Sequence, residues 1–325
     1  MNILVCSAGR RVKLVQYFKK ELDEIGGKVI AVDCDLTAPA LSFAHHFEVV
    51  PRISDPNYLP VIKQICNKYQ VTAILSLIDP ELSLLAGWKD EFSEIGTIAI
   101  ISDKKVVDMT FDKYRTYQFL KENDFPYIPT FITYQDVCNA LINKEIQFPL
   151  MVKPRMGSAS IGLCKVYSLV ELETALHSSK EPVIIQPFIE GNEYGVDCYI
   201  DLLTEKVTNI FLKRKIKMRA GETDKSVAIK NVKLLNLIEQ FVNKMKPRGP
   251  IDIDCFETSN GFVITEVNPR FGGGYIHAHE AGQNFVKNII RNLQGKENDV
   301  QLNNYIEGTI LIKWDDCVFI TEKTE

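Results

Sequence analysis

Two spacings of apolar residues alternate along the first third of the chain. Short apolar runs, typical of buried strands, are separated by stretches in which apolar residues recur every three or four positions, typical of helices. The runs occupy residues 2–6, 28–33, 47–50, 72–77 and 98–101, and the helical stretches occupy 12–25, 41–44 and 58–69, with another helix opening at 79–81. Strands that alternate with helices predict a parallel, doubly wound α/β sheet, a Rossmann-like domain, over about the first 105 residues.

After residue 103 the pattern becomes mixed, and we expect a second domain of α+β type. Helices are predicted at 103–108, 111–122, 169–177, 229–245 and 279–292, and strands at 148–153, 163–167, 193–201, 206–212, 251–255, 262–267 and 307–313. We place the domain boundary between residues 108 and 109. Within 109–325 we expect two α+β subdomains, at about 112–187 and 188–325.

The strongest hairpin pattern lies at 251–267, where Ser259-Asn260-Gly261 separates two runs of alternating polar and apolar residues. Asp254, Glu266 and Asn268 are expected on the face opposite the Ile and Val core residues. Two carboxylates and an amide oxygen on neighbouring strands form a site of hard oxygens suited to Mg²⁺. The alternative is that these acids form the solvated face of an edge hairpin, where most Asp and Glu residues lie.

Lys153 ends an apolar strand and is followed by the small-residue segment 155–162 and a second strand. A lysine that faces such a loop suits a nucleotide polyphosphate, because loop N–H groups approach the oxygens without obstruction by side chains. The alternative is a plain hairpin turn. The segment is not a P-loop, since it lacks the Walker pattern and is followed by a strand instead of a helix.

The basic run at 213–219 and the residues 220–225 that follow it are together predicted to form a mobile loop. A charge run of this kind usually forms a solvated face. Because this run lies between segments of nucleotide-binding type, Lys215 and Arg219 are also candidate contacts to a phosphate or an acceptor.

Polar residues follow two strands of the predicted N-terminal sheet, at the edge where such sheets bind ligands. Arg10 could hold a carboxylate there, and Asp79 and Glu81 could hold an amine. Helix capping is the competing interpretation of all three. Gly9 lacks the G-x-G-x-x-G spacing of dinucleotide-binding proteins, so a dehydrogenase is disfavoured.

Composition excludes several classes of protein. A formal net charge of −4 over 325 residues argues against a nucleic-acid-binding protein. The eight cysteines are scattered without a C-x-x-C motif, which indicates reduced thiols in a cytoplasmic protein. The apolar run 3–6 is too short for a signal peptide or a membrane span, and we expect no membrane partner.

The E-x-N-P-R order of Glu266–Arg270, with Asp254 before it, closely resembles the metal-binding hairpin of the ATP-grasp superfamily. The similarity is to the branch of carbamoyl phosphate synthase large subunits and carboxylate–amine ligases. The segments 111–114, 153–162 and 183–193 resemble the opening D-K dipeptide, the phosphate lid and the adenine hinge of these proteins. The resemblance implies a Rossmann-like pre-ATP-grasp domain followed by an ATP-grasp fold of two α+β subdomains.

The same resemblance implies roles for individual residues. Lys113 and Lys153 would hold the ATP phosphates, Asp254, Glu266 and Asn268 would hold Mg²⁺, and Arg270 would stabilise the transferred group, with Lys153 also acting in catalysis. The remaining ATP contacts would be Gly157, Ser158, Ser160, Ile161, Gln186, Pro187, Phe188, Ile189 and Glu193. Asp254 stands where relatives carry Glu or Gln, and the hinge carries Gln186-Pro187 where a glutamate is common.

The implied activity is that of an ADP-forming ligase, in which ATP and one or two Mg²⁺ ions, or Mn²⁺ instead, activate a carboxylate for capture by an amine. The partners would be the small-molecule carboxylate and amine, and a homodimer is compatible with the pattern. Two alternatives stay open: a bicarbonate-using subunit that resembles carbamoyl phosphate synthase and works with a partner, and an inactive ATP-binding module. The joint presence of Lys153, Glu266, Asn268 and Arg270 argues against the inactive module.

Overall fold

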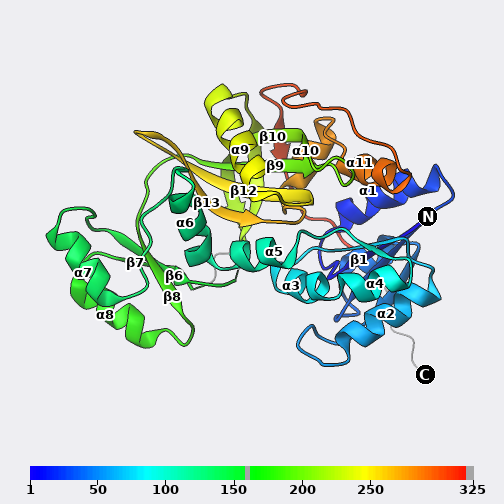
Figure 1. Ribbon diagram of the computed structural model, residues 1–325, viewed down its shortest axis with the longest axis horizontal. Coiled ribbons are helices and arrows are strands. Elements are labelled where there is room, and N and C mark those ends of the chain that lie inside the picture. Colours follow the sequence, from blue (N-terminus) through cyan, green and yellow to red (C-terminus); the bar gives the residue numbers. More distant parts are fainter. Residues whose placement is uncertain (158–161, 320–325) are drawn as a thin grey trace.

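The computed structural model describes residues 1–157 and 162–319. Three sheets organise the chain: a five-stranded sheet, a six-stranded sheet and a three-stranded sheet. Figure 1 shows the three-stranded sheet with α7 and α8 on one side of the molecule and the N-terminal sheet on the other, with the six-stranded sheet above and between them. The predicted fold class, a Rossmann-like domain followed by α+β subdomains, is confirmed.

The N-terminal domain is a parallel sheet in the order β3-β2-β1-β4-β5. Its strands are β1 (Asn2–Cys6), β2 (Lys28–Asp33), β3 (His46–Val49), β4 (Ala73–Ser76) and β5 (Ile98–Ala99). Its helices are α1 (Val12–Asp23), the 3-10 helix η1 (Pro39–Phe43), α2 (Tyr58–Lys68), α3 (Asp79–Gly87) and α4 (Lys89–Glu94). The strand order changes direction between β1 and β4, so the residues after these two strands lie where parallel sheets place a binding crevice.

Two helices connect this domain to the rest of the chain, α5 (Lys104–Phe111) and α6 (Lys113–Glu122). The predicted boundary at residues 108 and 109 falls within α5, and it stays a prediction. The three-stranded sheet, in the order β7-β6-β8, then forms a small subdomain with its own hydrophobic core. Its elements are α7 (Tyr134–Ile142), β6 (Leu150–Pro154), β7 (Cys164–Val166), α8 (Leu169–Ser178) and β8 (Val183–Pro187).

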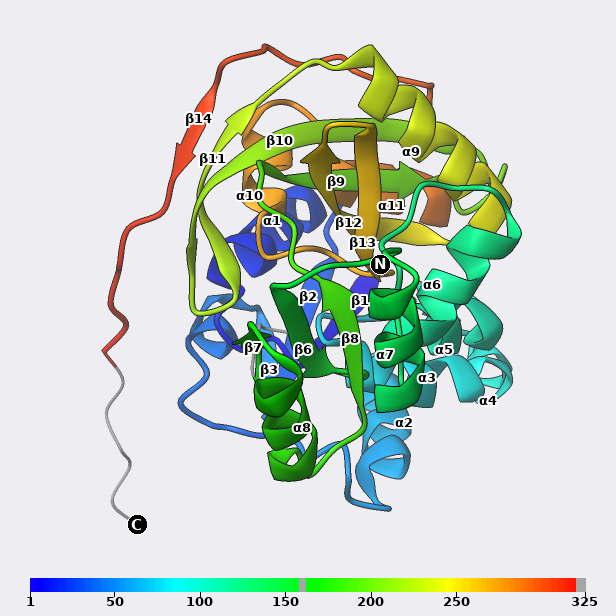
Figure 2. The same ribbon diagram turned by 90° about the vertical axis from the view of Figure 1, so that its left-hand side faces the viewer.

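The six-stranded sheet is antiparallel, in the order β13-β12-β9-β10-β11-β14. Its strands are β9 (Glu193–Ile200), β10 (Val207–Arg219), β11 (Glu222–Ala228), β12 (Gly249–Thr258), β13 (Gly261–Asn268) and β14 (Ile310–Ile312). Its helices are α9 (Val232–Met245), α10 (Tyr275–Glu280) and α11 (Phe285–Leu293). Figure 2 shows β14 as the outermost strand, beside β11.

Two sequence predictions are wrong in this part of the chain. Residues 213–225 are not a mobile loop, because β10 continues to Arg219 and pairs with β11 from Glu222 onward. The predicted helix at 279–292 is two helices, α10 and α11, separated by a turn in which Gly282 has a φ of 96°. Glycine adopts this left-handed conformation without the steric cost that a Cβ would add.

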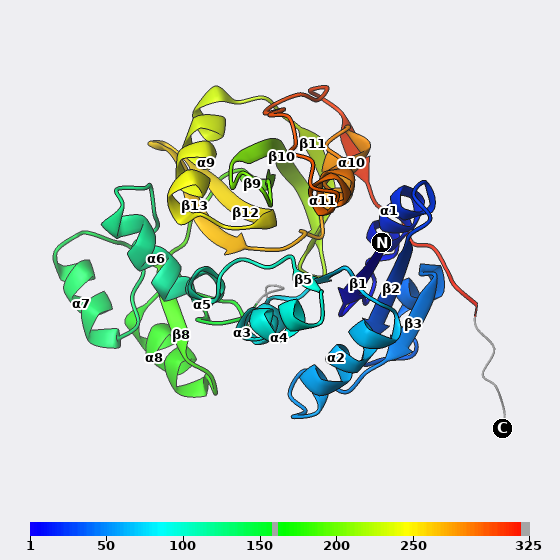
Figure 3. The same cartoon turned by 45° about the vertical axis from the view of Figure 1, so that its right-hand side comes forward.

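The N-terminal sheet and the six-stranded sheet share one hydrophobic core. Phe18 from α1 packs edge-to-face against Phe271, which follows β13, with the ring centroids 6.1 Å apart. Figure 3 shows α1 next to α11, between the two sheets. Ile3 and Leu75 of the N-terminal sheet belong to the same buried cluster as Phe211. The carboxyl ends of β1 and β4 are therefore held against the second domain.

All eight cysteines are free thiols, and half of them are buried. Within the described ranges, no helix combines the length and the apolar character needed to cross a bilayer.

Candidate active site

A cavity of about 550 Å³ lies where the three sheets meet. Its wall includes charged residues from the small subdomain, from the six-stranded sheet and from the start of α1: Arg11, Lys113, Lys153, Glu193, Lys215, Glu222, Asp252, Asp254, Glu266 and Arg270. This volume is in the range of small-molecule binding sites. Most of the residues that the sequence analysis selected converge here.

A β-bulge positions the acidic residues. Asp252 pairs with Asn268 and Asp254 with Glu266, but the register then shifts so that Cys255 pairs with Ile264. In a regular strand Glu266 would share a face with buried Ile264. The extra residue, Thr265, reverses this alternation, and its hydroxyl donates a hydrogen bond to the Asp254 carbonyl (3.0 Å). The predicted convergence of Asp254, Glu266 and Asn268 on one face depends on the bulge.

Two lysines of β10 lie across the same face of the sheet. Lys213 is buried and pairs with Asp197, and Lys215 lies 2.7 Å from both Glu193 and Asp254. Gly195 makes room for them, because a Cβ there would lie 2.9 Å from the Lys213 side chain and 3.3 Å from that of Lys215. The first part of the basic run is therefore paired inside the molecule instead of solvated.

The acidic cluster carries more negative charge than its local cations neutralise. Burial raises the pKa of Asp254 to about 7, with Asp252, Glu193 and Glu266 adding to the shift although Lys215 opposes it. A divalent cation between these oxygens would relieve this repulsion, so the donor set fits Mg²⁺. In the described part of the chain, no three His, Cys, Asp or Glu side chains form a metal-binding group. The predicted metal ligands, Asp254, Glu266 and Asn268, include only two residues of these four types, because the third ligand is an amide.

Lys153 and Lys113 approach the acids from the small subdomain. Burial lowers the pKa of Lys153 to about 8, with Glu266 opposing this shift and neighbouring Lys113 contributing to it. Asp112 fixes this corner, since its carboxylate caps α6 and accepts three hydrogen bonds from Arg155, with the closest at 2.7 Å. The Lys113 ammonium donates to the Gly157 carbonyl. Two lysines close together in a cavity form a site for an anion with several charges.

The predicted hinge residues Gln186, Pro187, Phe188, Ile189 and Glu193 all line the cavity. The Gln186 amide donates to the Thr130 hydroxyl (2.8 Å), so its side chain is already engaged within the protein. Gly157 also lines the cavity. Ser158, Ser160 and Ile161, the other predicted ATP contacts, lie outside the described residues.

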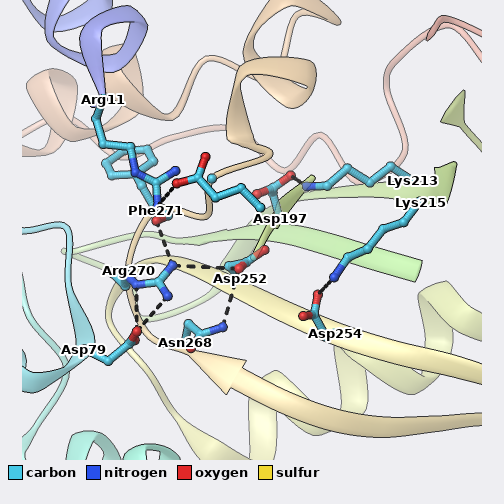
Figure 4. A network of polar contacts seen from close by, with 12 residues as sticks. Arg11, Asp79, Asp197, Lys213, Lys215, Asp252, Asp254, Asn268, Arg270 and Phe271 are labelled. Carbon is cyan, nitrogen blue, oxygen red and sulfur yellow. Dashed lines mark hydrogen bonds and ion pairs between the residues drawn. The ribbon is translucent and has the colours of Figure 1, made fainter. Parts of the chain in front are cut away.

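Arg270 is held by a residue of the N-terminal domain. Its guanidinium donates to Asp79 at 2.7 and 3.2 Å, and both side chains are buried. Asp252 lies 3.8 Å from the other side of the guanidinium (Figure 4). Asp79 therefore contributes to the site by orienting Arg270 between two carboxylates.

Three acceptor candidates lie elsewhere. Glu81 is fully buried and hydrogen-bonded to the hydroxyls of Tyr58 and Ser76. Residues two apart on a helix point in different directions, so Asp79 contacts Arg270 and Glu81 does not. Arg10 is exposed, and Arg219 pairs with Asp315 at 2.8 Å at the end of β10. None of the three lines the cavity, whereas Lys215 does.

Sequence reasoning missed Asp252, Arg11 and Glu222. Asp252 alternates with Asp254 in the same strand, and this spacing could have identified it. A signal for the other two lay in Gly272-Gly273-Gly274, which resembles a flexible run. A Cβ on Gly272 would lie 2.5 Å from Asp252, and one on Gly273 would lie 2.6 Å from Arg11 and 2.9 Å from Glu222. These glycines mark where charged side chains approach the backbone.

The site combines two lysines, a hairpin with acidic side chains and a buried arginine between antiparallel sheets. This combination is typical of a fold that binds a nucleotide together with a metal ion. The chain belongs to the ATP-grasp family: the family's domain model matches residues 110–274. The model of the PylC-like N-terminal domain matches residues 3–101.

Curated relatives support this assignment. Carbamoyl phosphate synthase arginine-specific large chain of Geobacillus stearothermophilus is 22% identical over 175 residues, which cover 51% of this chain and 17% of that protein. Formate-dependent phosphoribosylglycinamide formyltransferase of Prochlorococcus marinus is 24% identical over 278 residues, which cover 77% of this chain and 65% of that protein. The chain thus spans less than two thirds of the length of either relative.

Solved structures establish the fold. The biotin carboxylase domain of Hydrogenobacter thermophilus 2-oxoglutarate carboxylase, solved with MgADP and bicarbonate, superposes with a TM-score of 0.74 at 16% identity, covering 95% of this chain and 73% of that one. N5-carboxyaminoimidazole synthetase from Staphylococcus aureus gives 0.71 at 16% identity, covering 91% and 77%.

Proposed function

We propose that this protein is an ATP- and Mg²⁺-dependent ligase that activates a carboxylate as an acyl phosphate and transfers the acyl group to an amine, releasing ADP and phosphate. The observation that supports this most is the single cavity shared by Lys113, Lys153, the acidic hairpin and Arg270. Phosphoryl transfer needs positioned reactants and neutralised charge more than covalent chemistry by the protein. The family membership points the same way, as do the names of two further curated relatives, phosphoribosylamine–glycine ligase of Helicobacter pylori and D-alanine–D-alanine ligase of Marinomonas sp..

The proposed binding of ATP divides between the small subdomain and the six-stranded sheet. The nucleoside would lie against Pro187–Ile189 with Glu193 at the ribose, and Lys113 and Lys153 would neutralise the phosphates. Lys153 is suited to this role because its pKa, about 8, rises again when an anion approaches.

Mg²⁺, held by Glu266, Asn268 and Asp254 with Asp252 beside them, would supply neutralisation of the phosphate charge. Lys215 pairs with both Asp254 and Glu193, so it would keep Glu193 as its partner if Asp254 held the metal. Arg270, fixed by Asp79, presents its guanidinium to the carboxylate and then to the acyl phosphate, where charge accumulates.

An ADP-release screen tests the function. Carboxylates, bicarbonate included, and amines are supplied alone and in pairs with Mg·ATP, and we expect release to require one carboxylate and one amine together. Glu266→Ala should keep the fold and lower turnover about 10²-fold, the effect of losing one electrostatic element of a transition state. Full activity of this variant would show that the hairpin is structural. Release with bicarbonate as the sole carboxylate would indicate the carbamoyl phosphate synthase type of chemistry instead.

A further inference from the structure

The cavity has an end that the proposed ATP contacts do not use. It is lined by Arg11 at the start of α1, by Glu222 at the start of β11, and by the turn at Gly273 and Gly274. Figure 4 shows Arg11 and Arg270 on one side of Asp252, with Lys215 and Asp254 on the other. A nucleotide bound along the small subdomain leaves this end for a second substrate.

A paired cation and anion occupy this end of the cavity. Arg11 lies 3.3 Å from Glu222, and Lys313 approaches the same carboxylate at 3.2 Å. Burial would raise the pKa of Glu222, but Arg11 and Lys313 together hold it below its ordinary value. Arg11 and Arg270 line the same cavity. Burial lowers the pKa of Arg11, and the nearby charge of Arg270 adds to this shift, whereas Glu222 opposes it.

Gly273 leaves the space that the ion pair of Arg11 and Glu222 occupies. A Cβ on this residue would lie 2.6 Å from the Arg11 guanidinium and 2.9 Å from the Glu222 carboxyl carbon. The Lys313 ammonium donates to the Gly273 carbonyl (2.9 Å), which fixes the turn from the other side. Three separate segments of the chain therefore meet at one backbone position to hold the two opposite charges.

These charges select the kind of ligand. A simple anion would be attracted by Arg11 but repelled by Glu222, and a simple cation would meet the reverse. A molecule that carries both charges on one carbon matches a cation and an anion 3.3 Å apart, because each of its groups gains a partner as it loses water. Arginine binds a carboxylate through two parallel hydrogen bonds, and a carboxylate accepts from an ammonium group.

We infer that one substrate is an α-amino acid, whose carboxylate binds Arg11 and whose ammonium binds Glu222. This inference rests on the proposed ligase function and specifies one of its two substrates. Arg11 and Glu222 lie in the N-terminal domain and in the β10–β11 hairpin, so recognition of the amino acid requires both parts of the molecule to be in contact.

The test begins with the full chain and Mg·ADP. Calorimetric titration first measures the binding of Mg·ADP, and the loaded protein is then titrated with each of the twenty L-amino acids and D-alanine. The tightest-binding amino acid is compared with its methyl ester, which lacks the carboxylate charge, and with its desamino analogue. We expect each analogue to bind at least about tenfold more weakly, the loss typical of one charged hydrogen-bonding partner.

Variants provide the second part of the test. Glu222→Gln should weaken the amino acid about tenfold or more and tighten the desamino analogue, which the Glu222 carboxylate repels, while Arg11→Lys should weaken both. Mg·ADP affinity should not change in either variant. Lys13→Gln removes an exposed charge from the same helix outside the cavity and serves as the matched control. Melting temperatures check that each variant folds, and the comparison of analogues on the unmodified protein needs no variant.

The outcomes separate the two proposals. No binding of Mg·ADP would overturn the ligase function and, with it, this inference. Binding of Mg·ADP with no amino acid bound, or with the ester and the desamino analogue bound as tightly as the amino acid, would overturn the α-amino acid alone. Equal effects of Glu222→Gln on the amino acid and on its desamino analogue would overturn the assigned contact with the ammonium.

Discussion

Glu81 is a carboxylic acid enclosed in the N-terminal domain, between the hydroxyls of Tyr58 and Ser76. Burial raises its pKa from 4.5 to about 8. The folded protein therefore binds a proton at this position more tightly than the unfolded chain. The resulting stabilisation is complete below the unfolded value and is lost as the pH rises through the folded value.

Glu81→Gln should remove this pH dependence, because the amide stays neutral. Between pH 5 and pH 8 the unmodified protein should lose stability relative to the variant, by up to about 1.4 kcal/mol per pH unit. Chemical denaturation at several pH values measures the difference. Parallel stability curves for the two proteins would show that Glu81 is ionised in the folded state.

Asp79 has a different role although it lies only two residues away. Asp79→Asn preserves the volume but removes the charge that orients Arg270, and we expect turnover to fall about 10- to 10²-fold. The affinity for Mg·ADP should stay the same, because Arg270 is not assigned to the nucleotide. Steady-state kinetics and titration measure the two quantities. Glu81→Gln at pH 7 is the control, and equal kinetics for all three proteins would exclude a positioning role.

At the scale of elements, the regular pattern of strands and helices was predictable, and the irregular backbone was not. The alternation of apolar runs and helical spacing was sufficient for the parallel N-terminal sheet. The bulge at Thr265 has no local sequence signal, since it appears only when β13 pairs with β12. The same holds for β10, whose lysines look solvated until Asp197, Glu193 and Asp254 from other strands neutralise them. Most of the candidate site was identified by its motifs, whereas Arg11 and Glu222 required tertiary contacts to be seen.

The turn after β13 is packed tightly, which a substitution can test. In Gly272→Ala the new Cβ would lie 2.5 Å from the Asp252 carboxyl carbon, and Asp252 would have to move away from Arg270 and Asn268. We expect a loss of about 1–3 kcal/mol in stability, as in overpacked cores, together with lower turnover. Gly87→Ala is the control, because nothing lies within 4 Å of its Cβ at the end of α3. The control should be neutral or slightly stabilising, since alanine favours the helix. A Gly272→Ala protein as stable and active as this control would show that the turn has room to adapt.

At the scale of the whole molecule, the hydrophobic cores do not correspond one to one with the three sheets. The N-terminal sheet shares a buried cluster with the six-stranded sheet, and the ion pairs Arg270–Asp79 and Arg11–Glu222 connect the same two parts. The small subdomain has a separate core that includes Val137, Leu150 and Val166. Regions with a small core of their own open at lower free energy than the main body of a protein. The part of the chain that supplies Lys153 is thus the part least coupled to the rest.

Hydrogen exchange should reveal this difference directly. Without nucleotide, amides of β6 and β8 should exchange faster than those of β1 and β9, because the small subdomain can open without unfolding the shared core. Mg·ADP at about 100 times its dissociation constant should slow exchange in β6 and β8 by about 10²-fold, equivalent to about 2.7 kcal/mol, because opening then requires release of the nucleotide. Exchange detected by mass spectrometry of peptides from the four strands measures both effects, and Mg²⁺ alone is the control. Equal rates in all four strands before addition would show that the chain opens as one unit. Unchanged rates in β6 and β8 after addition would show that the nucleotide does not bind against the small subdomain.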